Sequence, residues 1–135
     1  MENRRNFVMK IAAGMTASGF VTNPEKSIAN QIPIKNVFIH HVFFWLKEPD
    51  NAEARTRFEN GLQLLITIPQ IQSSHVGVPV KSNREVVDDS FTYSYIAFFK
   101  NREDQAIYQT HPTHLQFIED CQTLWKKVIV YDAMD

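Results

Sequence analysis

Dense runs of β-branched and aromatic residues begin at Val37 and mark the folded part of the chain. VFIHHVFFWL (37–46) predicts a strand that is apolar on both faces, and such a strand is covered on both faces. The stretch around FTYSYIAFFK predicts a second strong strand over about 90–100, with Tyr93 on its odd-numbered face. A weaker strand is expected over 71–80, ended by glycine and proline, and a last one over 128–134. Four strands are therefore predicted.

Helical periodicity fills the gap between the first two strands. One apolar stripe recurs at the helical period and predicts a helix over about 51–67. The stripe consists of Ala54, Phe58, Gly61, Leu62 and Leu65. Asp50 or Asn51 can cap the start of this helix, and Pro69 ends it.

A second helical region follows the strong strand and is broken in the middle. It begins after Asn101, which has an acidic residue three positions on, and runs to about Gln109. His111-Pro112 interrupts it, because proline is tolerated only near a helix start, and a further segment is predicted to about Lys126. The expected apolar stripe of that segment is His111, His114, Leu115, Ile118, Cys121 (or Gln122) and Trp125.

The predicted element order is β-α-β-β-α-β, which is typical of the ferredoxin-like α+β arrangement. It has an antiparallel four-stranded sheet with helices on one face. The other face of the sheet stays apolar, and soluble monomers rarely expose such a surface. Packing of two sheets against each other would cover it, so the sequence predicts a homodimer.

Residues 1–36 differ from the remainder and are predicted to precede the domain, which spans 37–135. Arg4-Arg5 followed by Phe7-Val8 and a short weakly apolar run is typical of a twin-arginine export signal of the bacterial type. The alternative is an amphipathic N-terminal helix that belongs to the fold. The polar, proline-containing stretch 22–36 is expected to be a linker. If residues 1–22 act as a signal, the protein is exported to the periplasm; otherwise it is cytoplasmic.

Composition narrows the classes of partner and cofactor. The 135 residues suit one domain, and a formal net charge of −1 without a large basic cluster argues against a nucleic-acid partner. The single cysteine, Cys121, excludes an internal disulfide and a multi-cysteine zinc site. No run reaches the ~18 apolar residues that a membrane span needs.

Several stretches match a known family, and they cover roughly residues 37–134. They are His41-Val-Phe-Phe with Lys47, Ile68-Pro69, Gly77, Phe91-Thr-Tyr-Ser-Tyr95, Tyr108-Gln-Thr-His-Pro-Thr-His114 and Val128-Ile-Val-Tyr-Asp132. In these stretches the sequence resembles the stress-responsive A/B barrel family, also called the Dabb family. The Y-x-x-H-P-x-H element is the most specific of them. The resemblance implies a dimeric α+β barrel built from two ferredoxin-like sheets.

The resemblance also implies candidate site residues, although the family is functionally mixed and many members are known only as stress-induced proteins. In a plant polyketide cyclase of the family, a tyrosine and a histidine of the same element promote an aldol cyclisation without a cofactor. Those roles fall on Tyr108 and His114, and the strand-one histidine of that pocket falls on His41. The strand-three histidine is replaced here by Tyr93, which removes one titratable group.

Two functional hypotheses follow. The first is a stress-responsive barrel that binds a small apolar or carbonyl ligand without turnover. The alternative is a cofactor-independent lyase or cyclase on a polyketide-like carbonyl substrate, with His114 as general base and Tyr108 as oxyanion donor. A third reading, a monooxygenase of related fold, has no flavin or haem motif to support it.

Three further side chains carry conditional expectations. His111 either contributes to the ligand site or stabilises the break beside Pro112 by bonding to the backbone. His41 and Tyr93 share a pocket if the odd-numbered positions of the first strand face the helices. A metal site from His41, His111 and His114 lacks a carboxylate partner and standard spacing, so no metal is predicted.

Overall fold

A computed structural model describes residues 32–135 of the protein. The predicted export signal, and the predicted linker as far as residue 31, lie outside the described residues. Within them the element order is β-α-β-β-α-α-β. The elements are β1 (Phe38–Leu46), α1 (Ala52–Leu65), β2 (Ser73–Gly77), β3 (Tyr93–Phe99), α2 (Arg102–Thr110), α3 (Pro112–Cys121) and β4 (Trp125–Met134).

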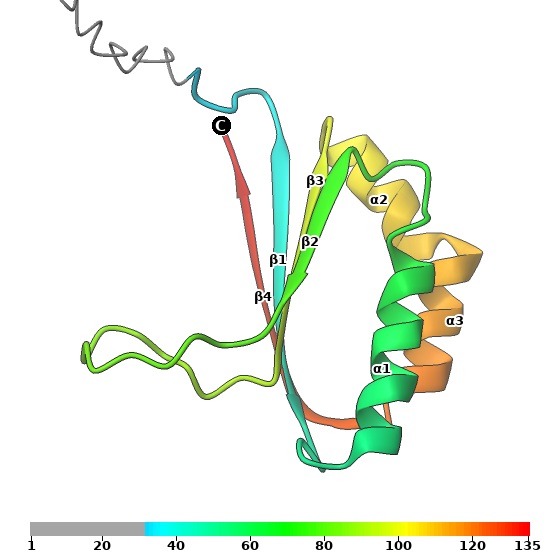
Figure 1. Ribbon diagram of the computed structural model, residues 1–135. Helices are drawn as coiled ribbons and strands as arrows, with labels where there is room; N and C mark the ends of the chain where they lie inside the picture. The colour runs from blue at the N-terminus through cyan, green and yellow to red at the C-terminus, as the bar shows by residue number, and fades with distance from the viewer. Residues whose placement is uncertain (1–31) are drawn as a thin grey trace, which may run out of the picture. The chain divides into compact units, whose positions relative to one another are not determined.

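The four strands form one antiparallel sheet in the order β2-β3-β1-β4, and the three helices of the described chain lie together on one face of it (Figure 1). This confirms the predicted ferredoxin-like α+β fold. The break at His111-Pro112 divides the second predicted helix into α2 and α3.

The end of the second helical region was predicted too late. α3 ends at Cys121 and not near Lys126, and β4 begins at Trp125 and not at Val128. Trp125 is the register partner of Leu46, and the Lys47 amide donates to the Leu124 carbonyl at 2.9 Å. Pairing with the full length of β1 therefore takes these residues away from the helix.

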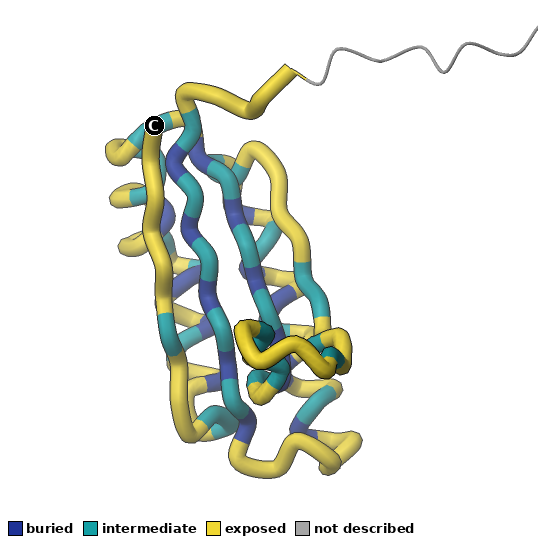
Figure 2. Tube along the Cα trace, turned by 90° about the vertical axis from the view of Figure 1, so that its left-hand side faces the viewer, coloured by how far each residue is buried: buried dark blue, intermediate teal, exposed yellow. Residues whose placement is uncertain are grey.

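Strict alternation in β1 decides which side chains face the helices. Its even-numbered residues are buried and its odd-numbered residues are only half-buried, an alternation that Figure 2 shows along the two central strands. In β3 the odd-numbered residues are the buried ones. The register explains this, because Phe44 pairs with Tyr93 and Val42 pairs with Tyr95. Side chains opposite each other in register share a face of the sheet.

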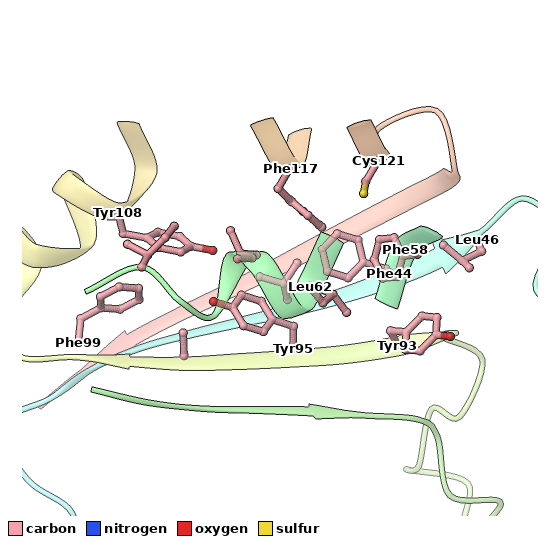
Figure 3. Packing of buried hydrophobic residues seen from close by; sticks show 14 of the residues in the cluster. Phe44, Leu46, Phe58, Leu62, Tyr93, Tyr95, Phe99, Tyr108, Phe117 and Cys121 are labelled. Carbon is pink, nitrogen blue, oxygen red and sulfur yellow. The ribbon is translucent and has the colours of Figure 1, made fainter. Parts of the chain in front are cut away.

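An aromatic-rich core fills the space between this sheet face and the helices (Figure 3). α1 contributes Ala54, Phe58, Leu62 and Leu65, as its stripe predicted. In α3, the predicted Leu115 is 56% exposed, and Phe117, at 4%, takes its place. Full burial of a leucine or phenylalanine side chain stabilises the folded state by roughly 1.5–3 kcal/mol.

Close packing of α1 against α3 depends on Gly61. A Cβ at this position would lie 2.6 Å from the Cys121 sulfur and 3.1 Å from the Phe117 ring. Glycine thus lets the two helices approach, which holds α3 against the core. Asn51 caps α1 by accepting a hydrogen bond from the Ala54 amide at 3.0 Å, as predicted.

Within residues 32–135, no element covers the second face of the sheet, and this apolar surface is here called the open face. It consists of the half-buried or exposed side chains Ile39, His41, Phe43, Trp45, Ile96, Phe98, Ile129 and Tyr131. Phe43 packs edge-on against Phe91 and Tyr131, with ring centroids 5.0 and 6.1 Å away. No helix within residues 32–135 is long and apolar enough to cross a membrane.

Candidate functional site

A partly open cavity of about 150 Å³ lies between the sheet and the helix layer, next to β4. Most of its wall is apolar and comes from Val42, Phe44, Leu65, Phe117, Ile118, Trp125, Val128 and Val130. The polar side chains His40, Tyr95, Tyr108, Gln109 and His114 also line it. An apolar pocket with a few convergent polar groups is the usual form of a small-molecule site.

A wider groove of about 430 Å³ lies at the other end of β1, beside Trp45 and Arg55. It is open to solvent, and its Lys81 is 3.7 Å from the carboxylate of Asp89. No histidine lines this groove. The smaller cavity next to β4, where two histidines and two tyrosines converge, is therefore the candidate site.

The helix break brings Tyr108 and His114 together. Tyr108 lies in the last turn of α2 and His114 in the first turn of α3, and their ring centroids are 4.8 Å apart in an edge-on arrangement. Between them the backbone of His111 is extended, and Pro112 occupies the first turn of α3. A continuous helix would place residues six apart on different sides, so the break is what aims both rings at the cavity.

His111 stabilises this break. Its Nδ1 accepts a hydrogen bond from the Thr113 amide at 3.1 Å, so its side chain caps the start of α3. It does not line the cavity. Of the two roles considered for His111, the structure shows the contact expected for the break.

His40 completes the polar end of the cavity. It is 6% exposed, and its Nδ1 donates a hydrogen bond to Asp132 Oδ1 at 2.7 Å. Asp132 is its register partner on β4, so the pair lies on one face of the sheet. The His40 ring meets Tyr108 edge-on at 5.7 Å. A carboxylate on one ring nitrogen fixes the tautomer and orientation of an imidazole.

Burial sets the protonation states at the site. Burial, and then the nearby His40, lower the pKa of His114 below its usual value of 6.5. Within residues 32–135, the Nδ1 atom of His114 is buried without a hydrogen-bond partner of regular geometry, although the backbone of Gln109 lies near the ring and opposes the lowering of its pKa. Burial, reinforced by the adjacent Tyr95, raises the pKa of Tyr108 far above its usual value. Near neutral pH the site therefore holds an uncharged imidazole, which can accept a proton, beside a phenol that can only donate one.

His41 and Tyr93 do not share a pocket, because the odd-numbered positions of β1 face away from the helices. His41 lies on the open face and hydrogen-bonds to Ser94 at 2.8 Å. Tyr93 is buried on the helix side but outside the cavity, and its hydroxyl donates to Glu59. The condition set for a shared pocket is therefore not met, because β1 and β3 pair even-numbered with odd-numbered residues.

Sequence reasoning missed His40, although it is adjacent to the predicted His41. Both faces of the first strand are apolar, so the pattern alone does not distinguish them. The one available signal was Asp132, an acidic residue inside the last predicted strand. Its pairing with His40 follows from the register between strands 92 residues apart, which the local sequence does not give.

Within the described part of the chain, no three histidine, cysteine, aspartate or glutamate side chains converge to hold a metal ion. Cys121 is buried, and burial raises the pKa of its thiol to about 11. At neutral pH this cysteine is an uncharged core residue.

Comparison with solved structures identifies relatives of the fold. The hydroxynitrile lyase from Passiflora edulis has a TM-score of 0.64 at 20% identity, with 76% of this chain and 95% of that chain covered. A protein from Arabidopsis thaliana has a TM-score of 0.62 at 23% identity, covering 73% and 94%. A dimeric ferredoxin-like protein of unknown function from Thermobifida fusca has a TM-score of 0.59 at 14% identity, covering 78% and 97%.

A comparison with curated proteins found no match. A family model described as the stress responsive A/B barrel domain matches residues 38–135, which span the sheet, all three described helices and the cavity. The chain therefore belongs to the stress responsive A/B barrel domain family.

Proposed function

We propose that this protein binds a small, mostly apolar carbonyl compound in the cavity between sheet and helices. A cavity of about 150 Å³ with apolar walls is large enough for a single aromatic ring. The observation that carries the proposal is the unpaired Nδ1 of His114, buried beside the Tyr108 ring. A buried polar atom without a partner costs roughly 1–3 kcal/mol, and a polar group of a ligand would satisfy it.

A second candidate function is a cofactor-independent lyase or cyclase acting on such a compound. His114 would take a proton from the carbon next to the carbonyl, so that the electrons of that C–H bond form a C=C bond and the π electrons of the carbonyl move onto its oxygen. Tyr108 would donate a hydrogen bond to that oxygen as it gains charge. The resulting carbanion equivalent can then attack a second carbonyl carbon, and the new alkoxide regains the proton from His114.

The pair formed by His40 and Asp132 favours this second function. A histidine held by a carboxylate is not needed to close an apolar pocket, but it keeps a polar ring in a fixed orientation against Tyr108. The likeness to the Passiflora hydroxynitrile lyase shows the fold, and a lyase activity of this chain is our proposal.

A panel of ring-sized aldehydes and ketones tests both functions. We expect at least one to raise the melting temperature of the wild-type protein, because a ligand at 100 times its Kd stabilises by about 2.7 kcal/mol. His114→Ala should lose most of that shift and any consumption of the compound. His75→Ala is the matched control, since His75 is exposed on β2 and outside the cavity.

The outcomes separate the two functions. Binding that needs His114, without consumption of any compound, supports the binding protein and contradicts the enzyme. Equal ligand-induced shifts in the wild type and in His114→Ala would contradict the assignment of the site.

We further infer that two chains associate through the open face. This face presents aromatic side chains on β1, β3 and β4, and the segment between β2 and β3 extends on the same side of the sheet (Figure 1). Such a patch is typical of an interface between subunits. The Thermobifida neighbour is described as dimeric, which supports the inference.

A further inference from the structure

Tyr95 is the residue of the cavity that neither the sequence motif nor the proposed chemistry uses. It lies in the middle of β3, on the helix-facing side, and is 1% exposed. Figure 3 shows its hydroxyl and that of Tyr108 pointing toward each other, one from the sheet and one from α2. Both phenols line the cavity together with His40 and His114.

The hydroxyl of Tyr95 is buried and has no hydrogen-bond partner of regular geometry. A buried tyrosine normally finds a partner for its hydroxyl. Tyr93, two residues earlier on the same face, does so by donating to Glu59. Phe99, four residues later on that face, packs into the core without a hydroxyl at all. The hydroxyls of Tyr95 and Tyr108 lie close enough for each to shift the pKa of the other, but they do not meet in regular hydrogen-bond geometry. Core packing therefore does not give the Tyr95 hydroxyl a regular partner such as Tyr93 has in Glu59.

Three polar groups at one end of this cavity thus meet without forming a closed set among themselves. Within residues 32–135, the Nδ1 atom of His114 and the hydroxyl of Tyr95 have no hydrogen-bond partner of regular geometry, and the Tyr108 hydroxyl faces that of Tyr95. The His40 ring contacts both phenols edge-on, at 6.5 Å from Tyr95 and 5.7 Å from Tyr108. Apart from Gln109, the remainder of the wall is apolar, so a ligand meets few other polar groups.

We propose that Tyr95 and Tyr108 form a two-hydroxyl donor site that binds a single ligand oxygen, so that the preferred ligand is a ring-sized compound with a carbonyl or phenolate oxygen. Two donors that converge on one oxygen stabilise negative charge on it far better than one. This inference deepens the proposed binding function and rests on it.

The protonation states fit a pair of donors. Burial raises the pKa of Tyr95 to about 12 and that of Tyr108 further still. Both phenols keep their protons over the whole range in which the protein would be assayed. Neither can become a competing anion in the cavity.

Two probes of one size test the donor site. 4-Nitrophenol, assayed as the phenolate, carries an anionic oxygen on the ring, whereas 4-nitrotoluene has a methyl group in the same place. Tyr95→Phe should weaken phenolate binding by roughly 10- to 100-fold, because a hydrogen bond to a charged group is lost. Binding of 4-nitrotoluene should change by less than about twofold, because Phe keeps the shape of the cavity. Tyr108→Phe should behave in the same way.

Tyr93→Phe is the matched control, since it removes a phenol from the same strand and face but outside the cavity. It should leave the binding of both probes unchanged. Without ligand, Tyr95→Phe should melt at the wild-type temperature or higher, because it removes an unpaired buried hydroxyl. Tyr93→Phe should melt lower, because it breaks the bond to Glu59.

Two outcomes would overturn the donor site alone, and a third would overturn the proposed binding function as well. If wild type and Tyr95→Phe bind the phenolate equally, the donor site is overturned and the binding cavity stands. If the ligand-free Tyr95→Phe variant loses as much stability as Tyr93→Phe, the hydroxyl is a structural group and the donor site is overturned. If neither probe binds the wild-type protein, both this inference and the proposed binding of ring-sized compounds fail.

Discussion

His40 and His41 are adjacent in the chain and lie in different chemical environments. His40 is buried under the helices and bound to Asp132, while His41 lies on the open face and is bound to Ser94. The cause is the two-residue period of a strand, which sends neighbouring side chains to opposite faces. Burial, and then the proximity of His40 and His75, lower the pKa of His41. The side chain of His40 therefore lines the cavity, and that of the next residue, His41, lies on the open face.

The lowered pKa of His114 makes folding sensitive to mild acid. In the window between the folded pKa and 6.5, the unfolded chain binds more protons than the native one, so stability falls as the pH falls through it. The melting temperature of the wild type should therefore decrease from pH 7.5 to pH 5.

The His114→Ala variant should show a smaller decrease over the same pH range, because its group at this position no longer titrates. Differential scanning calorimetry in buffers of equal ionic strength measures both slopes. Identical slopes would show that His114 titrates alike in the folded and unfolded chain.

At the scale of elements, the break between α2 and α3 is the feature that builds the site. Proline lacks the amide proton that a continuous helix would need, and the extended backbone at His111 redirects the chain. Tyr108 and His114 consequently face each other from two helices. The rest of α3 is held by its close contact with α1 at Gly61.

Because the His111 side chain caps α3, its removal should destabilise the protein. His111→Ala should lower the free energy of unfolding by about 1 kcal/mol, the usual cost of losing an N-cap. His111→Asn should retain most of the stability, since an asparagine side chain can also accept from the backbone. Urea titrations followed by circular dichroism measure both.

Thr110→Ala is the control for this series, because Thr110 is exposed in the last turn of α2. Its effect should stay within about 0.5 kcal/mol. Equal stability of His111→Ala and the wild type would contradict a capping role.

For the whole molecule, the distribution of apolar surface decides the behaviour in solution. The helices cover one face of the sheet (Figure 1), and the aromatic side chains of β1 leave the other face apolar. Phe43 lies centrally in this surface, in contact with His41, Phe91 and Tyr131. A charge placed there should oppose association of two chains, because it would be buried without a partner.

Phe43→Lys should therefore convert a dimer into a monomer at micromolar concentration, as light scattering coupled to gel filtration would show. Leu115→Lys is the matched control, because Leu115 is 56% exposed on α3, on the opposite side of the sheet from the open face. Its mass should equal that of the wild type. A monomeric wild-type protein would contradict association through the open face.

The sequence by itself determined the class of the fold and pointed to two of the side chains that line the candidate cavity. The strand and helix periods could be recognised in the sequence because the elements bury one face more than the other. Asn51, Pro69 and Pro112 mark helix ends that follow from local backbone chemistry. Tyr108 and His114 were found through a short motif whose geometry is local. The export signal stays a prediction from the sequence alone.

Only the tertiary structure decided which face of β1 looks into the cavity. Which face it is depends on the register between strands far apart in the chain. This register places His40 at the cavity in place of the predicted His41, and it leaves Tyr93 outside the cavity. The same pairing lengthened β4 at the expense of α3. The unpaired hydroxyl of Tyr95 also emerged only from the packed core, because whether a polar group is satisfied depends on every element around it.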